Sequence, residues 1–199
     1  MVVAALMLAQ PVLAGKTANT VMVSDVKGDL SKLYLPNGGA APWPENSPVG
    51  QADYMDIKEV SISKQTDTFV LTMTMWCKDL LAELVAMPKG TNMLTWCHFL
   101  DTNLDGRYDF VIALGWDGST FYSWNVKIGN PSIDLDPPTW CITGATITLR
   151  VDANAIGNPS SLALWSVTRV YWSPFELNIF GGWFNVDIPD TWQSTVWPA

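Results

Sequence analysis

Basic charge and histidine are both scarce in this chain. Its 199 residues include 11 Lys and Arg against 19 Asp and Glu, so the formal net charge is −8, and His98 is the single histidine. An acidic chain is repelled by phosphate backbones, which argues against nucleic acid as a partner. Any histidine-based triad would have to use His98, and its neighbour Cys97 would face the opposite side of a strand. We therefore predict that the protein is not an enzyme.

One catalytic alternative stays open at this point. Two carboxylates at a suitable separation can hydrolyse glycosides, and spacing along the chain does not show whether any two of the acidic residues lie that close. A serine nucleophile has no support, because the sequence contains no G-x-S-x-G motif.

Cysteine is rare as well, and each of the three residues follows a tryptophan: Cys77, Cys97 and Cys141. The absence of a C-x-x-C pair argues against a structural zinc or redox site. In an exported chain two cysteines would pair and one would be left over, and the spacing does not select the pair. The alternative is that all three are small buried apolar residues at strand ends.

Charge is absent from the first fourteen residues, which are apolar except for Gln10 and end in Val12-Leu13-Ala14. This is typical of a signal peptide with a small-residue cleavage site, although no basic residues precede it. We expect residues 1–14 to be a signal peptide or an apolar N-terminal segment, and residues 15–199 to form a single domain. The predicted location is secreted, extracellular or at the cell surface.

Alternation of apolar and polar residues with a period of two is the dominant pattern. It predicts strands over residues 20–24, 57–63, 69–75, 93–100, 110–116, 121–128, 145–151, 162–172 and 183–188. Residues 80–87 would be one short helix or a loop, and residues 35–50, rich in Pro and Gly, would be a loop. Many strands with turns between them predict an all-β fold, a single antiparallel β-sandwich of the jelly-roll or immunoglobulin-like type.

Residues 101–109 read Asp-Thr-Asn-Leu-Asp-Gly-Arg-Tyr-Asp and carry oxygen at alternate positions. Calcium takes about six to eight oxygen ligands, and the first six residues match D-x-[DN]-x-[DN]-G. The predicted ligands are Asp101, Asn103, Asp105, the Arg107 carbonyl and Asp109. An EF-hand is not expected, because Ile112 stands where its bidentate Glu would be. We predict a calcium loop between two strands; the alternative is a turn without an ion.

A second group of acidic residues lies elsewhere in the chain. Because chain ends often meet in sandwiches, Asp25, Asp29, Asp53 and Asp56 are candidates for a second metal site. Turn and cap positions are the alternative role for these residues.

Short motifs also suggest a family resemblance. They are Asp25-x-x-Gly28-Asp29, Asp53-x-x-Asp56-Ile57, Thr66-Asp67-Thr68, the loop from Asp101 to Gly106, residues 156–161, and Val186-x-Ile188-Pro189-Asp190. In this order they resemble secreted β-sandwich domains of the carbohydrate-binding-module and DOMON-like kind. The resemblance implies a sandwich fold and bound calcium, and it implies no particular ligand.

Tryptophan is abundant, with 11 residues, and its ring faces stack on sugars. Trp43, Trp116 and Trp183 are the candidates for an exposed ligand platform; burial in the core is the alternative.

Two functions follow from these features. The first is a non-catalytic, calcium-stabilised structural subunit that self-assembles into a surface layer or filament. Residues 15–23 would add as a strand to a neighbouring copy, and the contact would cover apolar side chains of a chain with a mean hydropathy of +0.14. The alternative function is a carbohydrate-binding module or another extracellular ligand-binding sandwich, with polysaccharide as the partner.

Overall fold

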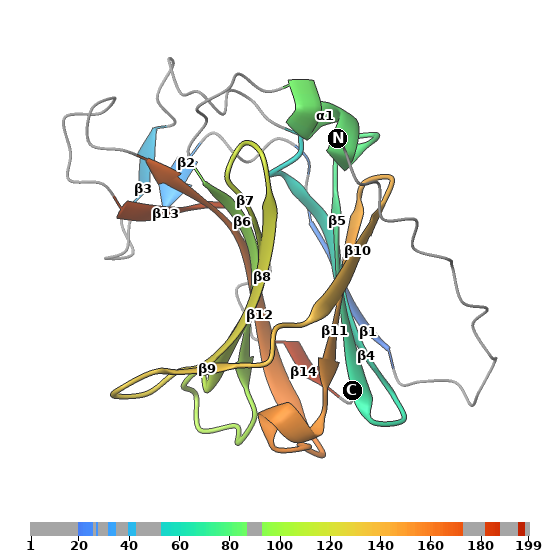
Figure 1. The fold of residues 1–199 in the computed structure, drawn as a ribbon, viewed down its shortest axis with the longest axis vertical. Coiled ribbons are helices and arrows are strands. Elements are labelled where there is room, and N and C mark those ends of the chain that lie inside the picture. Colours follow the sequence, from blue (N-terminus) through green and yellow to red (C-terminus); the bar gives the residue numbers. More distant parts are fainter. Residues whose placement is uncertain are drawn as a thin grey trace, which may run out of the picture.

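The computed structural model describes residues 20–25, 27, 32–34, 40–42, 53–86, 93–172, 182–187 and 195–197. In this part of the chain, two antiparallel β-sheets face each other as two layers, seen edge-on in Figure 1. The predicted all-β, two-sheet sandwich is therefore confirmed. Residues 1–14, Asp29 and Trp43, on which several predictions rest, lie outside the described residues.

Fourteen strands, one α-helix and one short 3-10 helix make up the described structure. In chain order they are β1 (Val21–Ser24), β2 (Lys32–Tyr34), β3 (Ala40–Pro42), β4 (Ile57–Gln65), β5 (Thr68–Met75), α1 (Leu80–Ala86), β6 (Leu94–Asp101), β7 (Phe110–Trp116), β8 (Phe121–Lys127), β9 (Ile133–Leu135), β10 (Thr139–Thr143), β11 (Thr146–Asp152), η1 (Asn154–Ile156), β12 (Leu162–Trp172), β13 (Gly182–Asp187) and β14 (Thr195–Trp197).

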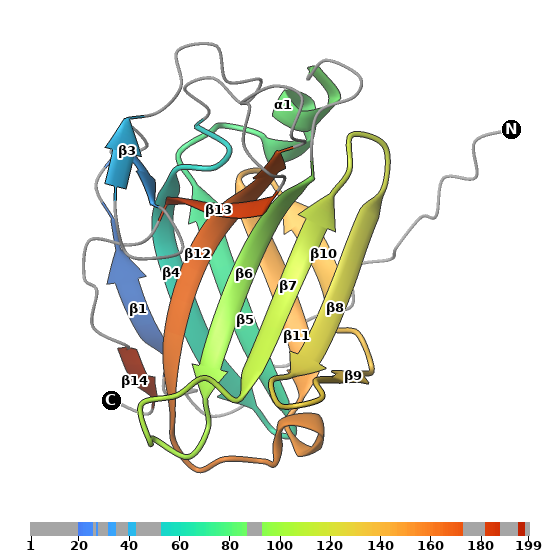
Figure 2. The same ribbon diagram turned by 90° about the vertical axis from the view of Figure 1, so that its left-hand side faces the viewer.

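Sheet A contains five strands in the order β1-β4-β5-β11-β10. Sheet B contains nine strands, with the path β3-β2-β13-β12-β6-β7-β8-β9, and β14 pairs with the other end of β12. Figure 2 looks onto the outer face of sheet B, where β12, β6, β7 and β8 lie side by side. The link from β9 to β10 carries the chain from sheet B to sheet A.

The core lies between the two sheets and follows from the alternation in the sequence. On β5, Phe69, Leu71 and Met73 are fully buried, whereas Thr68, Thr72 and Thr74 on the other face are only half-buried. On β6 of the facing sheet, Trp96 and Leu100 are fully buried on the same side of the strand. Successive side chains of a strand point to opposite faces, so this spacing places one row of each strand in the core.

Helix α1 closes one end of the sandwich. Asp79 precedes it, and its Oδ1 accepts a hydrogen bond from the Ala82 backbone N–H at 3.1 Å, which satisfies one of the free donors of the first turn. Leu80 and Leu84 are buried against the core, while Val85 is exposed. Residues 80–86 of the predicted segment 80–87 are thus a helix, and residue 87 lies outside the described residues. No helix of the described part has the length and apolarity required to cross a membrane.

Two predictions about local structure are corrected. Residues 35–50 were expected to be loop, but Ala40–Pro42 forms β3 at the margin of sheet B. Proline is tolerated there because an outermost strand has one side without a partner. Strand β10 was not predicted, since Pro137 and Pro138 directly precede it and resemble the start of a loop.

Candidate functional site

The outer face of sheet B is apolar, although it points away from the core. Cys97 on β6, Ala113 on β7 and Val167 on β12 are at most 2% exposed and form a second apolar cluster. Larger half-buried side chains pack against them: Phe99, Val111, Trp124 and Trp165. This is the face turned toward the viewer in Figure 2. An apolar outer face is typical of a surface that contacts a partner or ligand, which makes this face a candidate site.

Three rings lie together on this face, and we call Phe99, Tyr108 and Trp165 the outer aromatic cluster. Phe99 and Trp165 are directly opposite each other on paired strands, with ring centroids 5.1 Å apart. Tyr108 comes from the loop before β7 and is nearly parallel to Trp165, with an interplanar angle of 12° and centroids 5.5 Å apart. All three rings are half-buried, so each retains accessible surface.

Trp124 extends the apolar face onto β8. A Cβ atom built on Gly115 would lie 2.7 Å from the Trp124 ring and 2.6 Å from Met93 Cε. Both neighbours would have to shift to accept this atom, which the flexible end of Met93 can do more easily than the Trp124 ring. The glycine at position 115 therefore leaves space for that ring.

Polar groups border the aromatic rings. The Arg169 guanidinium lies 6.0 Å from the centre of the Phe99 ring, within the range of a cation–π contact. Tyr122 is 47% exposed on the same face, and its hydroxyl donates to Asp117 Oδ2 at 2.9 Å. Backbone hydrogen bonds from Thr120 and Ser119 lower the pKa of Asp117 to about 2, so this carboxylate stays ionised. Rings bordered by hydrogen-bonding groups are the usual composition of a sugar-binding surface.

The predicted calcium loop lies beside the outer aromatic cluster and is closed by its own hydrogen bonds. Asp101 Oδ2 accepts from the Gly106 N–H at 2.8 Å, Asn103 Oδ1 from the Asp105 N–H at 2.9 Å, and Asp105 Oδ1 from the Arg107 N–H at 2.9 Å. Asp109 Oδ2 accepts from both the N–H and the hydroxyl of Thr102. Gly106 has a φ of +83°, as the sharp turn requires.

The fit of this loop to an ion is partial. Within the described ranges, no three His, Cys, Asp or Glu side chains come close enough together to hold a metal ion. A carboxylate has about four lone-pair sites, so the hydrogen bonds use only part of the acceptor capacity of the loop. Amide and main-chain carbonyl oxygens, from Asn103 and Arg107, would have to complete a ligand set.

Tyr108 belongs to this loop. Burial raises the pKa of the Tyr108 hydroxyl, and the nearby Asp101 carboxylate raises it further. The loop conformation therefore sets the position of one ring of the outer aromatic cluster.

The candidates for a second metal site lie near one another but differ in environment. Asp53 forms an ion pair with Lys27 at 2.8 Å, so a side-chain cation already balances its charge. Asp25 is 8% exposed and Asp56 is 1% exposed. These three described residues do not form a metal-binding group.

The predicted tryptophan platform is corrected at Trp116, whereas Trp43 lies outside the described residues. Trp116 is 9% exposed and belongs to the core, where its ring packs on Phe121 with centroids 4.7 Å apart. Trp183 belongs to β13, of which the backbone alone is described. Successive side chains of a strand alternate between its two faces. Trp116 lies on the inner face of β7 together with Leu114, whereas Trp165 lies on the outer face of β12, so the outward-facing ring is at position 165 and not at position 116.

His98 lies on the inner face of sheet B and is 1% exposed. Its Nδ1 is 2.8 Å from the hydroxyl of Ser166 on the adjacent strand. Burial lowers the pKa of His98 to about 3, which keeps the ring neutral at physiological pH.

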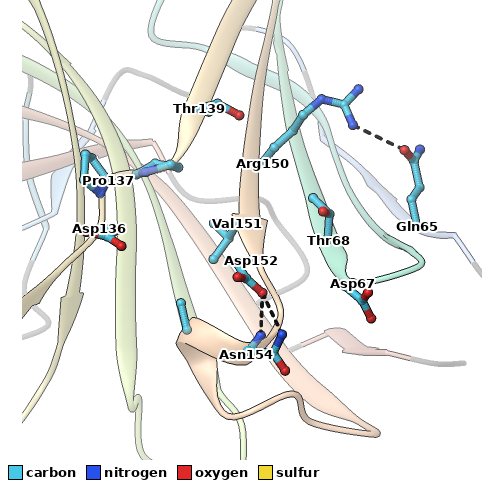
Figure 3. Close-up of a pocket in the computed structure, with 12 residues that line it drawn as sticks. Gln65, Asp67, Thr68, Asp136, Pro137, Thr139, Arg150, Val151, Asp152 and Asn154 are labelled. Carbon is cyan, nitrogen blue, oxygen red and sulfur yellow. Dashed lines mark hydrogen bonds between the residues drawn. The ribbon is translucent and has the colours of Figure 1, made fainter.

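A polar pocket of about 620 Å³ lies at the end of sheet A. Figure 3 shows Asp136 and Pro137 on one side, with Arg150 on the other side reaching Gln65. The Arg150–Gln65 hydrogen bond is 3.2 Å long, and Asp152 is bound by the backbone and side chain of Asn154. The lining is polar and contains no aromatic ring, so this pocket is the rival site for a hydroxyl-rich ligand.

The sequence signal for the outer aromatic cluster was the run of apolar residues on both faces of residues 162–172. Prediction focused instead on tryptophans in loops and near the C-terminus.

Comparison with protein-family models, with curated proteins and with solved structures gives no match for this chain.

Proposed function

We propose that this protein is a non-catalytic, extracellular β-sandwich of the jelly-roll or immunoglobulin-like type that binds carbohydrate on the outer face of sheet B. The observation that carries the proposal is the outer aromatic cluster, three half-buried rings on the solvent side of a sheet. The resemblance to carbohydrate-binding-module and DOMON-like domains supports the same class. With a net charge of −8, a neutral polysaccharide is a better ligand than an anionic one.

Several features support a binding role without catalysis. The one histidine is enclosed between the sheets and bonded to Ser166, where a polymeric substrate does not reach it. The extracellular location is inferred from the apolar residues 1–14. Calcium in the 101–109 loop is part of the proposal, because an ion there would fix Tyr108 against Trp165.

The test is retardation of the protein in native gels that contain hydroxyethylcellulose, xylan or laminarin. We expect retardation by at least one of these neutral polysaccharides. Loss of a central aromatic contact typically costs about 2 kcal/mol or more, so Trp165→Ala should weaken binding roughly thirtyfold. Trp165→Phe, which keeps a ring, should retain part of the binding, and Trp76→Ala, in a half-buried tryptophan elsewhere, should retain all of it.

Two results would contradict the carbohydrate proposal. One is equal binding by wild type and Trp165→Ala. The other is loss of binding in Arg150→Ala with Trp165→Ala unaffected, which would move the site to the polar pocket.

The second candidate function is the self-assembling structural subunit. The observation that favours it is the open edge of sheet A, where β10 has no second strand neighbour among the described residues. The predicted strand addition by residues 15–23 is corrected in part, because Val21 to Val23 belong to β1 and already pair with β4 of the same chain. Residues 15–19 lie outside the described residues, and association through them stays a prediction. Size-exclusion chromatography with and without a chelator tests the assembly, and a monomer under both conditions would contradict it.

A further inference from the structure

Among the strands that the structure describes, β10 has a neighbour on one side only and forms an edge of sheet A. Its five residues, Thr139–Thr143, contain no charge and no proline and consist of residues that favour strands. The other outer strands are shorter, and β3 ends in Pro42 and β9 contains Asp134. Natural sheets protect their edges with charge, proline or short strands, because unpaired backbone groups pair with other chains. An edge without these features indicates a pairing surface.

The direction of the backbone groups on β10 follows from the neighbouring strands. The Met75 N–H donates to the Ala145 carbonyl on the β5 side of β11 at 3.0 Å. Backbone groups of successive residues point to opposite sides of a strand, so those of Thr146 and Thr148 face β10. Thr143 and Cys141, their partners in the register, must face β11 in return. Trp140 and Ile142 therefore direct their N–H and C=O groups to the open edge.

We propose that β10 pairs antiparallel with β10 of a second copy of this chain, about a two-fold axis at Cys141. This register is the one that matches all five residues, with Thr139 opposite Thr143. Trp140 of each copy then lies opposite Ile142 of the other copy. Each of these two pairs exchanges two backbone N–H to C=O hydrogen bonds, which gives four in all. The two A sheets become one continuous sheet.

The same register places the two Cys141 residues opposite each other. They form a pair without backbone hydrogen bonds across the axis, for which the Cα separation is about 4.5 Å. A disulfide needs roughly 4.4–6.8 Å between Cα atoms. Cys141 is exposed and its thiol is free, whereas Cys77 and Cys97 are buried. The backbone hydrogen bonds of the strand edge hold the interface together. The Cys141 residues are not required for it, but a disulfide between them would show that the two strands pair in this register.

Covalent closure of this interface requires an oxidant, for which we name a low-molecular-weight disulfide such as oxidised glutathione. The Cys141 thiolate of one copy attacks it, forms a mixed disulfide and releases one glutathione thiol. The Cys141 thiolate of the other copy then attacks the mixed disulfide and releases the second. Two protein thiols are oxidised and one small disulfide is reduced to two thiols.

The experiment compares Cys141→Ser with Cys141→Lys by sedimentation velocity in reducing buffer, with circular dichroism as the check of folding. The serine variant should remain dimeric like the wild type, because the backbone pairing is intact. The lysine variant should be monomeric, because two ammonium groups would face each other across the axis. A wild type that stays monomeric over the accessible concentrations would overturn the pairing, whatever the outcome of the polysaccharide test.

Register is tested by adding oxidised glutathione and sequencing the linked peptides. We expect a Cys141–Cys141 link in the wild type, and slower linkage in the double variant Cys141→Ser with Thr143→Cys, whose cysteines would not face each other. A dimer that the lysine variant leaves intact, or a wild type that forms no Cys141 link, would assign the interface to another surface.

Discussion

Protonation of His98 should couple the stability of the sandwich to pH. Burial lowers its pKa to about 3, against 6.5 for an exposed histidine. Between these two values the unfolded chain binds a proton that the folded chain does not bind. Stability from this residue is therefore complete above pH 6.5 and is lost as the pH falls toward 3.

The size of the effect follows from the two pKa values. One pH unit corresponds to about 1.4 kcal/mol, so the loss of stability at pH 4.5 is roughly 3 kcal/mol, rising to about 4 kcal/mol at pH 3, where the folded residue is half protonated. His98 is 1% exposed, so solvent does not screen this cost. Carboxylates also titrate in this range, and the contribution of His98 must be measured against a variant that lacks the imidazole.

The assay is urea unfolding of wild type and His98→Asn at several pH values between 7.5 and 4.5. Asparagine keeps a polar group near the Ser166 hydroxyl, which His98 Nδ1 contacts at 2.8 Å. Its cost from the lost ring volume does not depend on pH. We expect the stability of the wild type relative to that of His98→Asn to fall by roughly 3 kcal/mol over this interval. A difference that stays constant with pH would refute the assignment of a buried, neutral His98.

Two further predictions concern the outer face of sheet B and its neighbouring loop. Gly115→Ala should destabilise the protein by about 1–3 kcal/mol and shift the fluorescence of Trp124, because the new Cβ would lie 2.7 Å from that ring; unchanged unfolding and emission would show that the ring does not rest on Gly115. Calcium should raise the melting temperature of the wild type, and Asp101→Asn and Asp105→Asn should abolish the increase, whereas Asp117→Asn in another turn should keep it. A wild type that melts at the same temperature with calcium and with chelator would count against the ion.

The fold class could be predicted because the core is built on period-two alternation that is visible in the sequence. Strands β7 and β12 match the predicted segments 110–116 and 162–172 residue for residue. Strand β10 could not be predicted in this way, because five residues after two prolines give little periodic signal. Its place beside β11 depends on a hairpin turn at Gly144, where φ is +57°.

The candidate site was harder to predict than the fold. An aromatic residue in a strand is consistent with either face, and only the register of the sheet decides which one it occupies. Trp116 and Trp165 illustrate this, since one packs in the core and the other in the outer aromatic cluster. The loop at 101–109 was located from local spacing alone, but its hydrogen bonds to its own backbone required coordinates.

The central claim is that the outer face of sheet B binds carbohydrate, and tryptophan side-chain NMR tests it most directly. Indole N–H signals would be assigned by single substitutions and followed as the retarding polysaccharide is added. The signals of Trp165 and Trp124 should move, while that of Trp96, fully buried with its indole N–H donating to the Tyr54 carbonyl, should stay in place. Saturation of the protein with polysaccharide while the Trp165 and Trp124 signals remain unchanged would contradict the claim.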